Sequence, residues 1–129
     1  MTEKSVITPY ELMGGEATVL SLVDRFYFYM DTLPEVQGIR KIHAESLSNA
    51  KDKLFKFLSG WLGGPDLFIQ EFGHPMLRRR HLPFAIGQSE SDQWMICMNK
   101  AMSELEMDED LKKALLESLD QLAHHMMNQ

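Results

Sequence analysis

Residues 60–94, GWLGGPDLFIQEFGHPMLRRRHLPFAIGQSESDQW, are the stretch of this 129-residue chain that says most about its fold. The glycines and prolines in this stretch break any helix into short pieces, because proline lacks the amide hydrogen and glycine weakens helical order. His81 follows three consecutive arginines and comes shortly before Pro83, and Trp94 stands thirteen positions after His81. The stretch therefore predicts short helical pieces that hold one histidine between two long helices.

Helical periodicity continues through the rest of the chain, where apolar residues recur every three or four positions. Thr8 and Glu11 flank Pro9 with the spacing of a capping box, which predicts a short first helix that ends at Gly14-Gly15. We expect further helices over residues 16–33, 35–41, 46–62, 89–105 and 108–127. The predicted fold class is all-α, in one domain over residues 1–129 with a flexible extension at residues 1–7.

Composition excludes several classes of protein. The net charge of −6 argues against nucleic-acid binding, and no apolar run reaches the roughly 20 residues of a membrane-spanning helix. The start, MTEKSVITPYELMGG, lacks the basic and then apolar pattern of a secretory signal. The single cysteine, Cys97, can form no internal disulfide and is expected to be buried beside Met98. These features together predict a cytoplasmic location.

The chemistry-bearing residues do not match common metal or phosphate sites. One cysteine cannot build a structural zinc site, and neither HExxH nor paired CxxC spacing occurs. An imidazole can instead ligate haem iron, for which the chain offers His43, His74, His81, His124 and His125. His81, in the irregular stretch, is the best placed to point between two helices. A structural role nevertheless remains the commoner interpretation of a lone histidine.

Two further groups of residues have both a functional and a plain interpretation. Arg78, Arg79 and Arg80 form a solvated basic face or, alternatively, pair with carboxylates of a bound molecule. The polar groups Tyr27, His43 and Trp94 are large buried side chains or donors to a bound, partly negative dioxygen. Ala50 and Leu54, one helical turn apart, are plain core residues unless a cofactor lies beside them.

From about Tyr10 to His125 the chain resembles the truncated haemoglobins of the second group, whose helices form a two-over-two sandwich around haem. The resemblance rests on the stretches YELMGG, RFY (25–27), LFKFLSGWLGGP and GHPMLRRRHLPFAIGQSESDQW. It implies a haem b cofactor (iron protoporphyrin IX) with His81 as its proximal ligand, on the side of the iron opposite the bound gas. It further implies distal polar groups at Tyr27, His43 and Trp94 beside an apolar wall at Ala50 and Leu54.

The resemblance also assigns the residues near the haem edge. Arg80 is the first choice as partner of a haem propionate, and Arg78 is the second. Phe68 stands where the family often has tyrosine, so one hydrogen bond near the propionates is expected to be missing. In the absence of a gas ligand, His43 or Tyr27 is a candidate sixth ligand of the iron.

Three functions follow as hypotheses. The first is reversible binding of dioxygen, nitric oxide and carbon monoxide by a monomer or homodimer. The second is redox detoxification of nitric oxide, peroxynitrite or peroxide, as a nitric oxide dioxygenase or a peroxidase-like enzyme. This second function needs a partner reductase, because nothing in the chain could bind flavin or nicotinamide. The third is a cofactor-free helical interaction domain.

Overall fold

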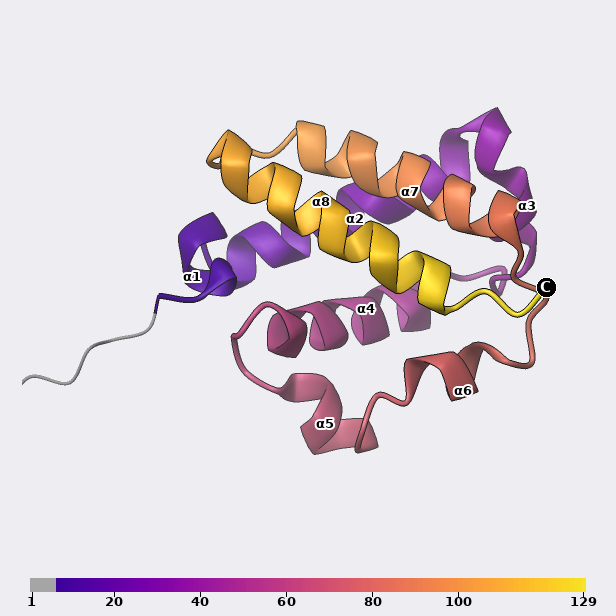
Figure 1. The fold of residues 1–129 in the computed structure, drawn as a ribbon, viewed down its shortest axis with the longest axis horizontal. Coiled ribbons are helices and arrows are strands. Elements are labelled where there is room, and N and C mark those ends of the chain that lie inside the picture. The colour runs from indigo at the N-terminus through magenta and orange to yellow at the C-terminus, as the bar shows by residue number, and fades with distance from the viewer. Residues whose placement is uncertain (1–6) are drawn as a thin grey trace, which may run out of the picture.

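The computed structural model describes residues 7–129, which form an all-helical fold (Figure 1). Within these residues there is no strand, so the predicted all-α class is confirmed. The expected flexible extension lies outside the described residues, except for Ile7. The helices are α1 (Pro9–Met13), α2 (Glu16–Thr32), η1 (Pro34–Val36), α3 (Gln37–Lys41), α4 (Ser48–Trp61), α5 (Leu67–Phe72), α6 (Leu77–His81), α7 (Gln88–Ser103) and α8 (Glu109–His125).

Four long helices build the core in two pairs. Helix α2 packs against both α4 and α7, and α7 packs against α8, as expected for a two-over-two sandwich. Apolar residues recur at helical spacing along α2 and α7, so each helix turns an apolar face toward the interior. Among the fully buried side chains are Val19, Leu22, Phe26, Met30, Met98 and Met102. Cys97 is also buried, as predicted, and burial raises the pKa of its thiol to about 12.

The predicted helix ends are close to the observed ones. The amide of Glu11 donates to Oγ1 of Thr8 at 3.2 Å, and Gly14 ends α1 with a φ of 117°. Helix α4 begins at Ser48, two residues later than expected, and ends where the glycine pair 63–64 meets α1. A Cβ added at Gly64 would lie 2.6 Å from the ring of Tyr10, so only glycine allows this close approach.

The irregular stretch folds into short helical pieces, as predicted, and these are α5 and α6. Figure 1 shows α6 standing apart from the four long helices, and no residue of α6 is buried. Met76, just before α6, has a φ of 42°, a left-handed conformation that is strained for a residue with a side chain. The stretch therefore holds α6 through local contacts rather than through a buried face.

The far end of the chain returns to this stretch. The Asn128 side chain donates to the Phe84 carbonyl at 2.8 Å and accepts from the Ile86 amide at 3.0 Å. The amide of Asn128 donates to the Ile86 carbonyl at 2.8 Å, and its Nδ2 lies 3.4 Å from the carbonyl oxygen of His81. Asn128 thus fastens the segment that links α6 to α7.

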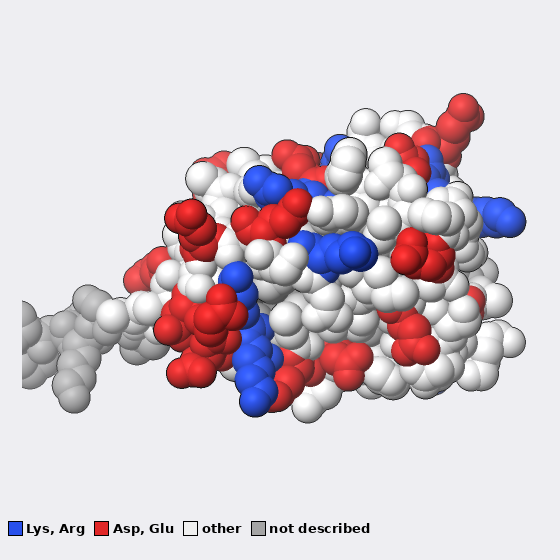
Figure 2. Space-filling view, turned by 90° about the horizontal axis from the view of Figure 1, so that it is seen from above, with Lys and Arg blue, Asp and Glu red and all other residues white. Residues whose placement is uncertain are grey.

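Two further observations concern the helices and the surface. No helix among residues 7–129 is long and apolar enough to cross a membrane. Figure 2 shows acidic and basic side chains intermixed on the face seen from above.

Candidate functional site

A cavity of about 610 Å³ lies among α4, α6 and α7, with further walls from α2, α8 and the loop after α3. Its volume falls within the range of roughly 300–1,000 Å³ that is typical of cofactor and ligand sites. Most of its wall is apolar. The apolar lining residues are Ile39, Ile42, Ala44, Ala50, Leu54, Phe57, Phe68, Leu77, Phe84, Ile86, Leu122, Ala123 and Met126.

Almost all of the site residues predicted from the sequence line this one cavity. They are Tyr27, His43, Ala50, Leu54, Phe68, Arg80, His81 and Trp94. Arg78 is not among the lining residues. Its side chain turns toward the end of the chain, where Nη1 lies 3.5 Å from the Met127 carbonyl oxygen. The structure therefore does not bring the second-choice arginine to the cavity.

His81 is the last residue of α6, and its ring orientation is fixed from within that helix. Nδ1 lies 2.6 Å from the carbonyl oxygen of Leu77, one turn earlier. A carbonyl oxygen can only accept, so Nδ1 carries the hydrogen and Nε2 of the neutral ring keeps a lone pair. This backbone hydrogen bond is the usual support of a metal-ligating histidine. His81 is thus prepared to ligate a metal through Nε2.

His43 has the same arrangement in the loop after α3. Its Nδ1 lies 2.8 Å from the Ile39 carbonyl oxygen, so Nε2 again keeps the lone pair. Burial lowers the pKa of His43, the Arg40 and His81 charges lower it further, and the bond to Ile39 opposes them. A neutral His43 of this tautomer offers an acceptor. The donor role expected from the sequence therefore does not fit the geometry.

Tyr27 and Trp94 line the cavity, and each aromatic side chain carries a hydrogen-bond donor, a hydroxyl and an indole N–H. The Tyr27 hydroxyl donates to the Ala50 carbonyl oxygen over 3.4 Å, a long bond that leaves the hydroxyl free to turn to a better acceptor. Burial raises the pKa of Tyr27, which keeps the phenol protonated. Phe26 packs edge-on against both rings, with centroids 4.9 Å from Tyr27 and 5.1 Å from Trp94. Phe26 thus sets the orientation of both donors.

Arg80 lines the cavity, but two of its three guanidinium nitrogens already donate hydrogen bonds to backbone carbonyls. Its Nε donates to the Pro75 carbonyl at 2.6 Å, and Nη2 donates to the carbonyls of Phe72 and His74 at 3.1 and 3.3 Å. Its guanidinium carbon lies 5.2 Å from the ring centroid of Phe68. Arg80 therefore fixes the strained turn before α6. For a carboxylate in the cavity it can offer Nη1.

Four polar residues of the cavity lining were not predicted from the sequence: Asn49, Lys53, Glu90 and Ser91. Lys53 of α4 is a second cation, and its position three residues after Ala50 could have indicated the shared helix face. Ser91 of α7, one turn before Trp94, is 2% exposed. Among residues 7–129 its hydroxyl has no hydrogen-bond partner. A buried hydroxyl of this kind is a group that a bound molecule can satisfy.

These residues fit haem better than a small polar ligand. A haem needs an apolar slot for its ring, an imidazole nitrogen for its iron and cations for its carboxylates. The cavity offers the apolar walls, Nε2 of His81, and the charges of Arg80 and Lys53. A second depression of about 710 Å³, between α7 and α8, is lined largely by charged and polar side chains. None of the predicted site residues lines that depression.

Comparisons with known proteins agree with this geometry. The family model for bacterial-like globins matches residues 8–128. The chain is 38% identical over 126 residues to the group 2 truncated haemoglobin YjbI of Bacillus subtilis, covering 98% of this chain and 92% of that protein.

Two solved structures extend the agreement to the fold. The cold-adapted truncated haemoglobin of the Antarctic marine bacterium Pseudoalteromonas haloplanktis TAC125 is 48% identical, with a TM-score of 0.93 over 95% of this chain and 99% of that one. The group II 2-on-2 haemoglobin of the plant pathogen Agrobacterium tumefaciens is 43% identical, with a TM-score of 0.94 over 99% of both chains. The chain therefore belongs to the bacterial-like globins, as a truncated haemoglobin of the second group.

Proposed function

We propose that this chain is a haem b protein that reversibly binds dioxygen and other diatomic gases, and that His81 would hold the iron. Truncated globins bind haem and small gaseous ligands, and the chain is a member of that family. The observation that carries the proposal is the Nδ1–H bond from His81 to Leu77, which leaves the lone pair of Nε2 for a metal in a cavity of about 610 Å³.

The remaining lining residues have three different roles in binding. Haem, when bound, supplies the iron that coordinates the gas. Leu54, Phe57 and Phe68 keep water from the ring, since apolar side chains line much of the cavity. The cations of Arg80 and Lys53 hold the propionates. Tyr27 and Trp94 donate hydrogen bonds to the bound gas, and carbon monoxide and nitric oxide enter the same space.

When no gas is bound, His43 is a better candidate for the sixth ligand than Tyr27. The neutral His43 ring already has a lone pair on Nε2, because Nδ1 donates to the backbone. A phenol ligates as its anion, and burial of Tyr27 opposes loss of that proton by raising its pKa. A ferric spectrum that shows only water-bound, high-spin haem, unchanged in His43→Ala, would exclude this ligand.

The haem proposal is tested by the visible absorption spectrum of protein expressed with a supply of haem. We expect a Soret band that weakens in His81→Gly and recovers when imidazole is added, because free imidazole replaces the missing ligand. His125→Gly, an exposed histidine at the end of α8, is the control and should leave the band unchanged. A folded wild-type protein without a Soret band would end the proposal and favour the helical interaction domain.

A second candidate function is removal of nitric oxide, or of peroxynitrite and peroxide, and His43 gives it specific support. An acceptor nitrogen beside two donors suits the peroxide reaction, in which a proton moves, whereas simple storage needs only donors. One nitric oxide, one dioxygen and one electron from a partner reductase yield one nitrate. Nitrate production that continues only while a reductase is present would support this function. If no such nitrate production occurs, storage or sensing of the gas is the favoured function.

A further inference from the structure

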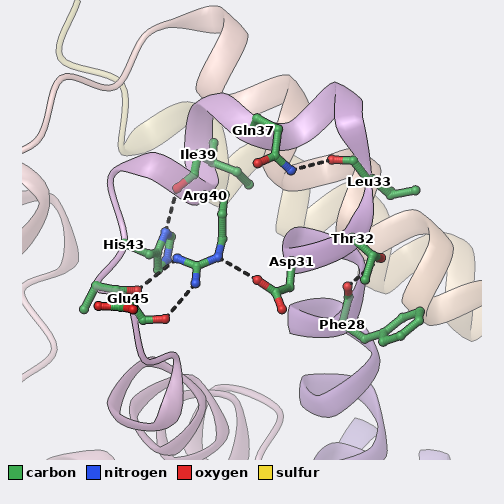
Figure 3. Close-up of polar contacts among 10 residues, drawn as sticks. Phe28, Asp31, Thr32, Leu33, Gln37, Ile39, Arg40, His43 and Glu45 are labelled. Carbon is green, nitrogen blue, oxygen red and sulfur yellow. Dashed lines mark hydrogen bonds and ion pairs between the residues drawn. The ribbon is translucent and has the colours of Figure 1, made fainter.

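Arg40, near the end of α3, joins three partners around the loop of residues 42–47 (Figure 3). Nε donates to Oδ1 of Asp31 on α2 at 3.0 Å. Nη1 donates to the Ala44 carbonyl at 2.9 Å, and Nη2 donates to the Glu45 carbonyl at 2.7 Å. All three guanidinium nitrogens are therefore engaged, and the side chain is only 18% exposed. Arg40 ties this loop to the last turn of α2.

His43 lies inside the segment that Arg40 encloses, and it is held from a second side as well. Its Nδ1–H donates to the Ile39 carbonyl, while the Ile39 amide donates to Oε1 of Gln93 on α7 at 3.0 Å. Helix α3 approaches α7 closely at Gly38, where an added Cβ would lie 2.8 Å from the Gln93 side-chain amide. The ring of His43 is thus fixed through α7, and its loop is fixed through Arg40.

We propose that Arg40 is a positioning residue for ligand binding: its three hydrogen bonds hold the 42–47 loop so that Nε2 of His43 faces the cavity. The inference rests on the proposed haem function. A planar guanidinium can donate in three directions at once, whereas a lysine ammonium is a single point charge on a flexible stem. Asp31 is exposed, so its ion pair with Arg40 would by itself contribute little to stability. The hydrogen bonds from Arg40 to the carbonyls of Ala44 and Glu45 are therefore the ones that hold the loop.

The test uses the holoprotein and four variants: Arg40→Gln, Arg40→Lys, His43→Ala and the double variant Arg40→Gln/His43→Ala. Arg25→Gln is the matched control, because Arg25 also joins α2 to a carboxylate, Glu104, but does not line the cavity. One readout is the C–O stretching band of bound carbon monoxide, which reports the polar groups around the gas. The other is amide hydrogen exchange in residues 42–47.

We expect Arg40→Gln and Arg40→Lys to speed exchange in residues 42–47 by about tenfold or more, because charged hydrogen bonds to the backbone are lost. Both variants should also shift or broaden the carbon monoxide band. In the double variant the band should match that of His43→Ala alone, because Arg40 acts through His43. If Arg40→Gln fails to fold, Asp31→Asn is the substitute, because it removes the charge of one of the three partners of Arg40. It should move both readouts in the same direction but by less.

Three results would overturn the inference while leaving haem binding intact. The first is a carbon monoxide band that is unchanged in both Arg40→Gln and Asp31→Asn, even if exchange is faster. The second is a wild-type band in Arg40→Lys, which would show that only the positive charge matters. The third is an unchanged band in His43→Ala. A wild-type protein that binds no haem would instead contradict the proposed function itself.

Discussion

The Nδ1 atom of His81 lies 2.6 Å from the carbonyl oxygen of Leu77. The same spacing of four residues recurs between His43 and Ile39, at 2.8 Å. Two imidazoles in one cavity therefore have the same tautomer, with Nδ1 protonated and Nε2 carrying the lone pair. The lone pair of His81 can ligate a metal, and the lone pair of His43 can accept a hydrogen bond.

This relationship can be checked directly by nitrogen-15 NMR of the diamagnetic carbon monoxide form. We expect slowly exchanging Nδ1–H signals from His81 and His43, because each proton is held by a backbone carbonyl. The exposed His125 should give no such signal and serves as the control. An Nε2–H signal from His43 would show that His43 is a donor and would remove its proposed role as an acceptor.

The lowered pKa of His43 predicts a pH-dependent stability. Below the ordinary value of 6.5, an unfolded chain protonates this imidazole while the folded chain resists protonation. The unfolded state then binds more protons, so the free energy of unfolding decreases as the pH falls from about 6.5 to the lowered pKa. His43→Gln should remove up to about 1.4 kcal/mol per pH unit of that slope.

The measurement is urea unfolding of the carbon monoxide form at several pH values between neutral and acidic. Since the other four histidines are shared, the difference between the two proteins isolates His43. Equal slopes for wild type and His43→Gln would contradict the prediction.

The Tyr27 hydroxyl should matter more for ligand retention than for stability. In Tyr27→Phe only a 3.4 Å hydrogen bond to the Ala50 carbonyl is lost, which should lower the free energy of unfolding by about 1 kcal/mol or less. Dioxygen should leave about tenfold faster or more, because a donor to a partly negative ligand is removed. Stopped-flow displacement by carbon monoxide measures this rate.

Tyr29→Phe is the control for that experiment, since the Tyr29 hydroxyl donates to Glu104 at 2.6 Å and does not line the cavity. It should leave the dissociation rate unchanged. A Tyr27→Phe protein that releases dioxygen at the wild-type rate would assign the retention to Trp94 instead.

Asn128 should control how firmly the segment after His81 is held. Replacing it with alanine removes the side-chain bonds to the Phe84 carbonyl and the Ile86 amide, at a cost of about 1–3 kcal/mol in local stability. We expect faster hydrogen exchange in residues 82–87 and faster transfer of haem to an acceptor globin. Asn99→Ala is the control and should change neither, because Asn99 lines the depression between α7 and α8 and not the cavity. An unchanged rate in Asn128→Ala would contradict the assignment.

The fold followed from the sequence because its determinants are local. The periodicity of apolar residues predicted the long helices, and the glycine pairs 14–15 and 63–64 predicted where the chain turns. The break-up of the irregular stretch into short helical pieces was expected from its glycines and prolines. The boundaries differ by up to two residues, because the last turn of a helix depends on contacts that periodicity does not contain.

The site was only partly predictable, because several of its supports are distant in the chain. Asn128 reaches a segment more than forty residues earlier, and no sequence pattern marks that contact. Arg40 contacts Asp31 across the turn between α2 and α3, which helical spacing cannot show. Arg78 failed to reach the cavity because consecutive arginines on a helix point in different directions. The predicted cytoplasmic location, the single domain and the monomeric or homodimeric state stay predictions.

Helix α6 carries the proposed iron ligand and yet has no buried residue. Because stability comes mostly from buried apolar surface, a substitution in α6 should barely change the melting temperature of the apoprotein. The same substitution can abolish haem retention if it reaches His81. A screen that ranks variants of this chain by thermal shift alone would therefore classify substitutions that abolish haem binding as neutral. Absorption spectra of the haem-bound protein are the appropriate screen.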